Sequence, residues 1–408
     1  MTLHQIVIVG GGAAGIATAA SLLKRRKGLD IAIIEPSEDH FYQPGWTMVG
    51  GGVFQAPTTR RSTASVMPAG VTHIKGAAAS FQPEENQVAL SDGRSVTYHM
   101  LIVATGIAPA WDAIPGLEQA LGKNGVTSNY RFDLAPYTYK LAQNLKSGRA
   151  IFTQPPMPIK CPGAPQKAMY LSCSLWEKAG ALGNIDVQFH NAGPALFGVK
   201  DYVPPLMDYI KRYNAHLNFG SKLIAVDGPN QKATFAQTGA DGTTQEVTLE
   251  YDMLHVTPPQ RAVDAVAKSP LADATGFVEV NAKTLQHTRF SNIFGIGDGC
   301  NTPNSKTAAA ARKQAPIVAV NLLSVMDGAP ATHAYDGYGS CPLTVEHGRA
   351  IVAEFGYGGK LLPSFPWDST KPRWLGWQLK ANFLPWLYWN AMLKGREWLA
   401  APLERHTD

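Results

Sequence analysis

Two short apolar runs with a helical pattern between them open the chain. Residues 6–9 read Ile-Val-Ile-Val, a β-branched run typical of a strand that is buried on both faces of a sheet. A helical pattern follows over residues 16–26, and a second apolar run over residues 31–34 ends at Glu35. Similar strand-like runs recur at residues 101–103, 149–153 and 292–296. This alternation predicts an α/β protein.

A glycine-rich turn joins the first strand to its helix and reads Gly10-Gly11-Gly12-Ala13-Ala14-Gly15. In this G-x-G-x-x-G pattern Gly10 allows the tight turn, Gly12 lets backbone amides approach a pyrophosphate, and Gly15 lets the helix pack closely on the strand. Glu35 follows twenty residues later, where a carboxylate can accept hydrogen bonds from a ribose. The alternative is an ordinary glycine-rich turn followed by an acidic residue with no role in binding. The spacing of strand, turn, helix and acidic residue favours a dinucleotide site.

Two later segments indicate which dinucleotide is bound. The strand at residues 101–103 runs into Ala-Thr105-Gly106, and the strand at residues 292–296 ends at Asp298, which is placed to bond a ribityl hydroxyl. Together with the N-terminal motif, this order resembles the glutathione-reductase-like flavoproteins, which have two dinucleotide-binding domains. The resemblance implies FAD as the cofactor, held by two Rossmann-like domains.

The second nucleotide motif of those relatives is missing. The strand at residues 149–153 leads into residues 154–165, which contain five prolines and Cys161. Proline lacks a backbone N–H and fixes φ, whereas a phosphate cradle needs free amides and glycines. The sequence therefore predicts that NAD(P)H is not bound, so that the reductant arrives by another route.

Three motifs give the resemblance its specificity. Residues 160–172 read K-C-P-G-A-P-Q-K-A-M-Y-L-S, residues 295–310 contain G-I-G-D and S-K-T-A-A-A, and residues 335–343 read Y-D-G-Y-G-S-C-P-L. They resemble sulfide:quinone oxidoreductase, in the branch that includes the mitochondrial enzymes, often called type II. The likeness extends over essentially the whole chain. The upstream cysteine of other branches has no counterpart around Ser128.

The resemblance implies that Cys161 and Cys341 are the catalytic redox pair, bridged by a disulfide or a trisulfide. Sulfide would attack the bridge, leaving a persulfide on Cys341, and Cys161 would pass electrons to FAD and then to ubiquinone or another membrane quinone. Sulfite, a thiol or sulfide would then accept the sulfur. The alternative is that both cysteines are ordinary buried thiols with no redox role. Cys173 is predicted to be a core thiol and Cys300 is given no role.

Further residues take roles by the same resemblance. Gln43 and Ala78 match FAD contacts. The family match also places the start of a predicted helix against FAD, namely Lys306, Thr307, Ala308 and Ala309; the alternative is an ordinary alanine-rich core helix. Lys160 and Lys167 flank the Cys161 loop and are either activating cations or solvated surface lysines. No acid–base residue is singled out; the candidates are His190, His255 and Glu118. Phe355, Tyr357 and Phe365 are candidates for the quinone entrance.

Composition excludes several classes of protein. Of 408 residues, 16% are charged and 45% hydrophobic, and the net charge is +5, which excludes a disordered or nucleic-acid-wrapping chain. Four cysteines without a C-x-x-C pair predict neither a metal site nor a disulfide scaffold. We expect no signal peptide, because a strand begins by Gln5, and no transmembrane helix, because no apolar run reaches 18 residues.

The C-terminal segment has an unusual composition. Six of the nine tryptophans lie in the last 42 residues, together with the cations Arg373, Lys380, Lys394 and Arg396. Pro385 is predicted to split two short helices, with Trp386, Trp389 and Leu393 on one face. Tryptophan with Lys and Arg is typical of a helix lying in the lipid headgroup region. The alternative is a helical pair packed on the protein or on another subunit.

These patterns divide the chain into three parts. An FAD domain is predicted from residues 1–112 and 286–325, a second domain with the sulfide loop from 113–285, and a membrane and quinone region from 326–408. The protein is then a peripheral membrane enzyme, on the inner membrane if the source is a bacterium; self-association is left open. Rival hypotheses are a flavocytochrome-type sulfide dehydrogenase, an NADH:quinone oxidoreductase and a non-catalytic flavin redox sensor.

Overall fold

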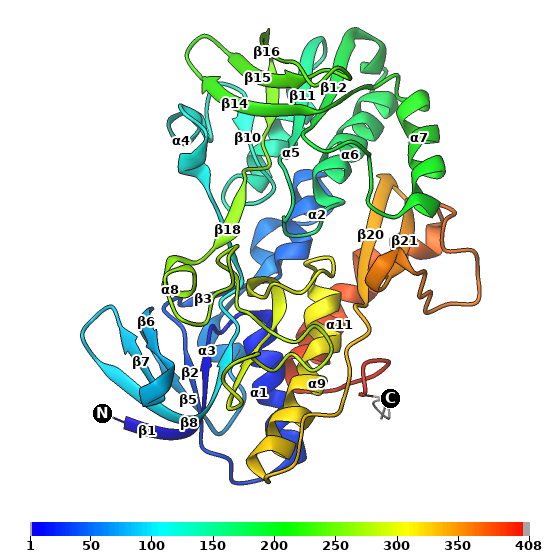
Figure 1. Cartoon of the computed structure of the whole chain (residues 1–408). Helices are drawn as coiled ribbons and strands as arrows, with labels where there is room; N and C mark the ends of the chain where they lie inside the picture. The colour runs from blue at the N-terminus through cyan, green and yellow to red at the C-terminus, as the bar shows by residue number, and fades with distance from the viewer. Residues whose placement is uncertain (1, 403–408) are drawn as a thin grey trace.

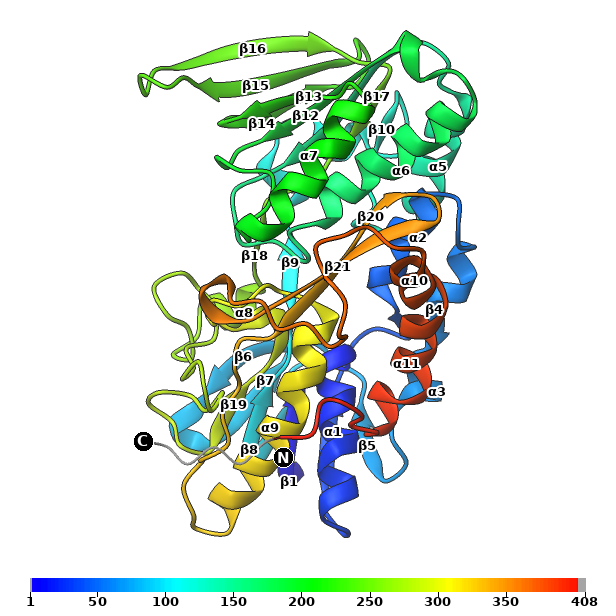
Figure 2. The ribbon, with the colours of Figure 1, turned by 90° about the vertical axis from the view of Figure 1, so that its right-hand side faces the viewer.

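The computed structural model describes residues 2–402, in which two α/β units are stacked one above the other (Figure 1). The unit at the bottom of the view holds the N-terminal strand, and the unit at the top is formed by the middle of the chain. The C-terminal segment runs along one side and contacts both units (Figure 2).

The first sheet has seven strands. Six follow the order β5-β2-β1-β8-β7-β6, and the seventh, β19, pairs with residues 101–103 at the C-terminal end of β8. Its strands are β1 (Thr2–Val9), β2 (Ile31–Ile34), β5 (Val71–Ile74), β6 (Ala78–Gln82), β7 (Gln87–Leu90), β8 (Ser95–Val103) and β19 (Ile293–Gly295). The pairs among β5, β2, β1, β8 and β19 are parallel. Helices α1 (Ala13–Arg25) and α9 (Ala308–Met326) pack together over the sheet. β6, β7 and β8 pair in antiparallel orientation, and the five parallel strands confirm the predicted α/β class.

The second sheet is parallel throughout, in the order β10-β17-β11-β12-β13. Its strands are β10 (Val126–Thr127), β11 (Gly148–Gln154), β12 (Ile185–Asn191), β13 (His216–Phe219) and β17 (Met253–His255). Helices α5 (Ala135–Asn144), α6 (Ala164–Lys178) and α7 (Val203–Arg212) lie beside it. An antiparallel sheet is added by β14 (Ser221–Asp227), β15 (Lys232–Thr238) and β16 (Thr244–Glu250).

The chain returns to the first unit earlier than the sequence suggested. Strands β9 (Ile107–Pro109) and β18 (Gln260–Ala262) pair as antiparallel connectors between the two units. Residues 263–285 were assigned to the second domain, but Val266, Leu271 and Leu285 are buried in the hydrophobic core of the first sheet. The boundary at residue 285 is therefore wrong, because these apolar side chains pack beside β19 and not beside β17.

The region after residue 325 is not a separate unit either. Strands β20 (Gly339–Glu346) and β21 (Arg349–Phe355) form a hairpin whose Leu343, Val345 and Ile351 join the core of the second unit beside α6. Farther along, Trp389 and Leu393 are buried in the core of the first unit. The C-terminal segment thus links the two units. Residues 403–408 of the predicted C-terminal region lie outside the described residues.

The predicted pair of C-terminal helices is one continuous helical run. Helix α10 (Trp374–Gln378) passes through a π-helical turn (Leu379–Phe383) into α11 (Leu384–Asn390). Pro385 lacks an N–H, and the wider π-turn just before it accommodates that loss without ending the helix. The predicted common face is also wrong, because Trp386 is 43% exposed while Trp389 and Leu393 are buried.

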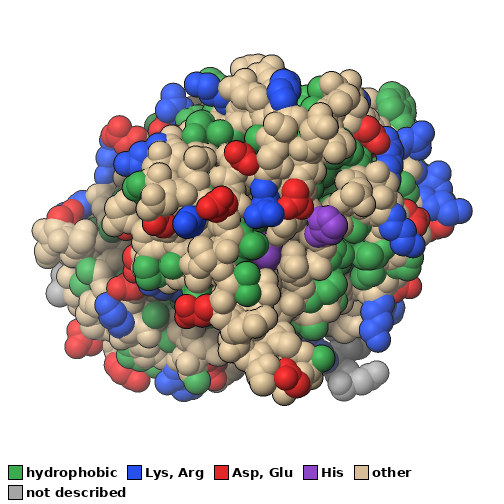
Figure 3. Space-filling view, turned by 90° about the horizontal axis from the view of Figure 1, so that it is seen from above, with side chains coloured by type: hydrophobic (Ala, Val, Ile, Leu, Met, Phe, Trp, Pro, Cys, Tyr) green, Lys and Arg blue, Asp and Glu red, His purple; other side chains and the backbone are tan. Residues whose placement is uncertain are grey.

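Two surface properties bear on function. Seen from above, over the second unit, basic and acidic side chains are interspersed (Figure 3). Within residues 2–402, no helix has both the length and the apolar character needed to span a bilayer.

Candidate active site

A cavity of about 570 Å³ lies where the two units and the C-terminal segment meet. It is lined by thirteen of the predicted cofactor residues: Gly10, Gly12, Ala13, Ala14, Glu35, Gln43, Thr105, Gly106, Asp298, Lys306, Thr307, Ala308 and Ala309. Cys161 lines the same cavity, whereas Cys341 lies behind it and is fully buried. Segments that are almost 300 residues apart in the sequence are thereby brought to one site.

Two predicted cofactor residues lie outside the cavity lining. Ala78 is in β6, on the hairpin edge of the sheet, and pairs with Leu90. Gly15 is inside α1, where a Cβ would lie 1.9 Å from the carbonyl oxygen of Gly10. Gly15 therefore acts through helix packing, as its place in the motif suggested, and Ala78 makes no contribution to this cavity.

The glycine turn leaves room for a ligand backbone. Gly10 has φ +109°, and a Cβ there would lie 2.4 Å from the carbonyl oxygen of Ala104, so only glycine fits. Gly12 faces open space, and a Cβ there would have no neighbour within 4 Å. Glu35 accepts a hydrogen bond from the Gly11 amide at 2.8 Å, which anchors its carboxylate beside the turn. This arrangement leaves the start of α1 facing the cavity, where a pyrophosphate binds favourably.

Other observations fit a flavin nucleotide here. The hydroxyl of Thr105 is buried in the cavity wall and has no hydrogen-bond partner among the described residues. Thr307 caps α9 by accepting a hydrogen bond from the Ala310 amide, so the helix begins at the cavity. Burial raises the pKa of Asp298, while Lys306 and Lys160 oppose that rise. An unpaired hydroxyl, a helix N-terminus and a buried carboxylate are the groups that a polar flavin side chain needs.

The two candidate cysteines meet although 180 residues separate them. The Sγ atoms of Cys161 and Cys341 lie 3.2 Å apart, and both thiols are free. Cys161 precedes α6, and Cys341 is in β20, which packs against that helix. Gly163 lets the strand come close, since a Cβ there would lie 2.6 Å from the Cys341 sulfur. A small movement of either side chain would bring the sulfurs to a disulfide bond length of about 2.05 Å.

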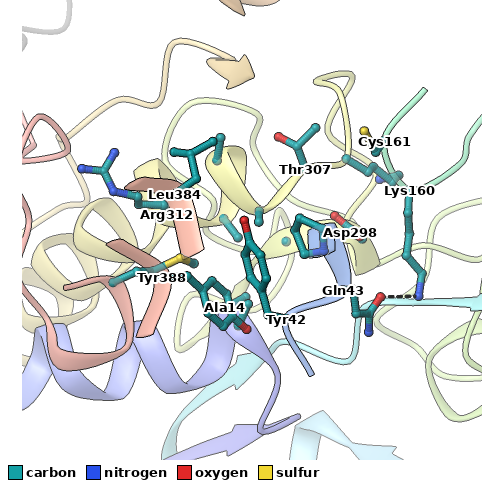
Figure 4. A pocket seen from close by; sticks show the side chains of 18 of the residues that line it. Ala14, Tyr42, Gln43, Lys160, Cys161, Asp298, Thr307, Arg312, Leu384 and Tyr388 are labelled. Atoms are coloured by element: carbon teal, nitrogen blue, oxygen red, sulfur yellow. Dashed lines mark hydrogen bonds between the residues drawn. The ribbon is translucent and has the colours of Figure 1, made fainter. Parts of the chain in front are cut away.

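Two hydrogen bonds fix the Cys161 loop, one to the first unit and one within the second. The Cys161 amide donates to the carbonyl of Lys306 at 2.7 Å, and the Tyr130 hydroxyl donates to the carbonyl of Lys160 at 2.9 Å. Cys161 itself has φ +50°, a left-handed conformation that is strained for a side chain other than glycine. The Lys160 ammonium donates to the side-chain oxygen of Gln43 at 3.0 Å (Figure 4). The loop therefore holds the Cys161 sulfur at one end of the cavity.

Lys167 places a buried positive charge on the two sulfurs. Its Nζ lies 3.2 Å from the Cys161 sulfur and 3.7 Å from the Cys341 sulfur, and the residue is only 3% exposed. The hydrogen bond from Cys341 and the charge of Lys167 hold the pKa of Cys161 well below its ordinary value, although burial opposes them. The contact with Cys161 and burial raise the pKa of Cys341. Cys161 is therefore the sulfur that carries negative charge most readily.

A third lysine was missed by the sequence patterns. Lys380 was assigned to a membrane-facing set of cations, but it is 2% exposed and donates to the carbonyl of Pro44 at 2.8 Å. Burial and the nearby Lys167 lower its pKa to about 7, while the two cysteines oppose that shift. It is the only charged residue between Arg373 and Lys394 in an aromatic stretch. A single lysine in so apolar a stretch was the sequence feature that could have indicated its burial.

The remaining candidates lie away from the cavity. Cys173 is buried within α6, and Cys300 is buried beside β19. His255 is fully buried and accepts a hydrogen bond from the Asn129 amide, whereas His190 and Glu118 are outside the lining. Among the described residues, no three His, Cys, Asp or Glu side chains are grouped for a metal ion.

This fold and this cysteine pair define a flavin-type disulfide oxidoreductase, and comparison with known proteins agrees. Residues 4–143 match the family model for pyridine nucleotide-disulphide oxidoreductases. The chain is 42% identical to the mitochondrial sulfide:quinone oxidoreductase of Dictyostelium discoideum, covering 96% of this chain and 86% of that protein. The Mus musculus enzyme of the same name is also 42% identical, with 96% and 87% covered.

The chain therefore belongs to the sulfide:quinone oxidoreductase family, which implies a flavin cofactor. A solved structure agrees at the level of the fold. The sulfide:quinone oxidoreductase of Aquifex aeolicus superposes with a TM-score of 0.81 at 21% identity, covering 97% of this chain and 92% of that one.

Proposed function

We propose that this protein oxidises sulfide to sulfane sulfur at a Cys161–Cys341 bridge and passes the electrons through FAD to a membrane quinone. The observation that carries the proposal is the pair of sulfurs 3.2 Å apart beside Lys167, at the end of a cavity lined by the flavin motifs. The full-length likeness to enzymes named for sulfide and quinone supports the same reaction.

The sulfur step starts from the oxidised bridge. Hydrosulfide attacks the sulfur of Cys341, a new S–S bond forms there, and the bond to Cys161 breaks to leave a thiolate on Cys161. The low pKa of Cys161 supports its role as the leaving thiolate, since a leaving group of lower pKa departs faster. Cys161 also lines the cavity, whereas Cys341 does not. Sulfite, a thiol or a second sulfide then removes the outer sulfur from Cys341 and leaves a second reduced cysteine. Re-forming the Cys161–Cys341 bond would release the two electrons that FAD accepts.

FAD supplies the two-electron carrier between sulfur and quinone. The start of α1 and Glu35 are placed to hold its pyrophosphate and adenosine ribose, and Asp298 its ribityl chain. The start of α9, at Thr307 to Ala309, presents free backbone amides that favour negative charge on a reduced ring. The segment at residues 154–165 contains five prolines, which lack the backbone N–H groups that a second phosphate-binding turn needs. NAD(P)H is therefore not a substrate in this proposal.

The C-terminal segment supports attachment to a membrane surface. Its exposed large apolar side chains are Trp374, Leu375, Phe383, Trp386, Trp398 and Leu399, and Lys394 and Arg396 are exposed beside them. An open apolar groove is formed there by Phe365, Trp367, Leu375, Leu379, Phe383 and Trp386. Of the three aromatic residues considered for the quinone entrance, only Phe365 lines the cavity. Phe355 is instead in the core of the second unit, and Tyr357 donates to the carbonyl of Ala282.

The reaction can be tested in two half-reactions. Purified holoenzyme is mixed anaerobically with sulfide while flavin absorbance is followed, and a short-chain quinone is then added. We expect sulfide to bleach the flavin, quinone to restore it, and NADH to do nothing. Cys341→Ser should abolish bleaching, whereas Cys173→Ser, a buried thiol on α6, should not. Equal bleaching of wild type and Cys341→Ser would contradict the cysteine mechanism, and bleaching by NADH but not by sulfide would contradict the proposed function.

Membrane attachment is tested separately with vesicles. Replacing Phe383 and Trp386 by serine removes apolar area from the groove, so binding to anionic phospholipid vesicles should fall severalfold. Phe219→Ser is the matched control, because Phe219 is 41% exposed on the second unit. Equal co-sedimentation of all variants would show that the C-terminal segment does not bind lipid.

A further inference from the structure

A buried carboxylate lies in the cavity wall and has no part in the sulfur chemistry. Glu354, in β21, is 4% exposed and lines the cavity. Its Oε1 accepts hydrogen bonds from the Tyr338 hydroxyl at 2.5 Å and the Ser364 hydroxyl at 2.6 Å, and its Oε2 accepts one from the Ser364 amide at 2.9 Å. Charged groups are rarely buried without a partner, so this position needs a physical reason.

The carboxylate has no ion-pair partner. None of the ion pairs formed within residues 2–402 includes Glu354. Arg312, on α9, lines the same cavity, and its buried Nε has no hydrogen-bond partner among the described residues. Tyr338 lies close to both, because Glu354 raises and Arg312 lowers the pKa of its hydroxyl, although burial is the main cause of its shift. The cavity thus holds a cation and a carboxylate that are not paired with each other.

Glu354 is close to Cys341 along the hairpin but lies on its other face. Glu354 pairs with Ser340 and Cys341 pairs with Ala353, so the side chains of Glu354 and Cys341 point to opposite sides of the two strands. In Figure 4, Arg312 and Leu384 are drawn at one end of the pocket and Cys161 and Lys160 at the other, with Asp298 and Thr307 between. The flavin-motif residues therefore separate the two ends in this view.

The cavity is continuous with the apolar groove of the C-terminal segment. Phe365, Leu379 and Phe383 line both the cavity and the groove. The segment that carries Phe365 is held by Glu354, because both bonds from Ser364 end on this carboxylate. An apolar molecule that enters from the groove therefore meets Glu354 as it reaches the interior.

We propose that Arg312 and Glu354 form the polar end of the quinone site, with Arg312 binding a quinone carbonyl oxygen and Glu354 acting as a proton donor. This inference rests on the proposed function. Reduction of a quinone adds two electrons and two protons. FAD, when bound and reduced, would supply both electrons and one of the protons. The second proton comes from solvent through Glu354: the carboxylate first takes up a proton, and its O–H bond then breaks as the O–H bond of the quinol forms.

The two side chains also match the charge changes that accompany reduction of a quinone. A quinone oxygen gains negative charge as electrons arrive, and a partly buried guanidinium stabilises that charge without reorganisation. Only a group that can release a proton completes the quinol, and a positioned acid typically contributes about 10²–10⁴-fold to such a step.

The test separates the two half-reactions by stopped flow. Glu354→Gln keeps the shape and the acceptor atom for Tyr338 but cannot release a proton. We expect reoxidation of the reduced flavin by a short-chain quinone to fall by about 10²-fold. Bleaching by sulfide should stay within about twofold, because the side chains of Glu354 and Cys341 point to opposite faces of the hairpin. Glu346→Gln is the matched control, since Glu346 is in the same hairpin but pairs with Arg212 outside the cavity.

A second variant tests the cation without relying on turnover. Arg312→Met should weaken equilibrium binding of a quinol analogue by about tenfold, measured by fluorescence quenching, and Glu346→Gln should leave it unchanged. The proposal is overturned if Glu354→Gln reoxidises within twofold of wild type, if both its half-reactions slow equally, or if Arg312→Met binds the analogue normally. If sulfide fails to bleach even the wild type, photochemical reduction of the flavin still allows the quinone phase to be measured, so that failure of the proposed function is distinguishable.

Discussion

Removing the charge of Lys167 is the sharpest perturbation of the sulfur site. Lys167→Met keeps the apolar stem and the volume of a buried side chain while it removes the ammonium that lies 3.2 Å and 3.7 Å from the two sulfurs. Without that charge the pKa of Cys161 rises, so its thiolate forms only at higher pH. The acid side of the pH profile for sulfide-driven flavin reduction should therefore move to higher pH.

The size of the effect follows from the contact distances. Two unit charges 3–4 Å apart interact by about 4–5 kcal/mol at an effective dielectric constant of ~20. The thiolate carries only part of its charge in the transition state for bridge opening, so we take about half, ~2 kcal/mol. That corresponds to a rate about 30-fold lower at neutral pH.

The assay is anaerobic stopped-flow reduction of the flavin by sulfide between pH 6 and 9. Lys178→Met is the matched control, because Lys178 is exposed at the far end of the same helix. The reasoning is refuted if Lys167→Met reduces its flavin within twofold of wild type across this range. A uniform loss with an unchanged pH profile would also refute it, because that result would indicate a packing defect and not a lost charge.

Three further predictions follow from buried contacts. Gly15→Ala should lose bound flavin, measured as the flavin-to-protein ratio, because its Cβ would lie 1.9 Å from a carbonyl oxygen of the same turn, whereas Gly183→Ala, in open space, should keep it. Lys380→Met should raise the melting temperature, and most strongly below pH 7. Because the pKa of Lys380 is about 7 in the folded protein, the folded state binds fewer protons than the unfolded chain between pH 7 and about 10, and the difference in melting temperature between the variant and wild type should shrink over that window. A difference that grows with pH would contradict this. Glu397→Ala removes the bonds to Arg25 at 2.5 and 2.7 Å and should cost about 1–3 kcal/mol in urea unfolding; an unchanged midpoint would show that this ion pair does not hold the C-terminal segment to α1.

Local patterns were sufficient for the parts of the fold that depend on neighbouring residues. The strand, glycine turn and helix at residues 6–26 follow from a β-branched run, the steric need for Gly10 and an amphipathic pattern, and all three are seen in β1 and α1. The loss of a second glycine motif was also readable, because prolines occupy the loop before α6.

Long-range packing decided what the sequence pattern could not. Lys380 and Trp389 fit a membrane-binding pattern as well as they fit a core, and only their contacts with Pro44 and with the first unit show that they are buried. Glu354 gave no signal at all, since a single glutamate in a strand reads as a surface residue. Residues 263–285 were misassigned because nothing local says which of two similar sheets an apolar segment will join.

The sequence by itself determined the two α/β units, the dinucleotide turn and the identity of the two candidate cysteines, because each depends on residues within one short segment or on the resemblance of short motifs. The tertiary structure alone decided that Cys161 and Cys341 lie 3.2 Å apart, that Lys167 and Lys380 are buried beside them, and that Glu354 faces the same cavity. The physical reason is that charge and reactivity at a buried site depend on distance and desolvation, and both are set by segments that meet only when the chain is folded.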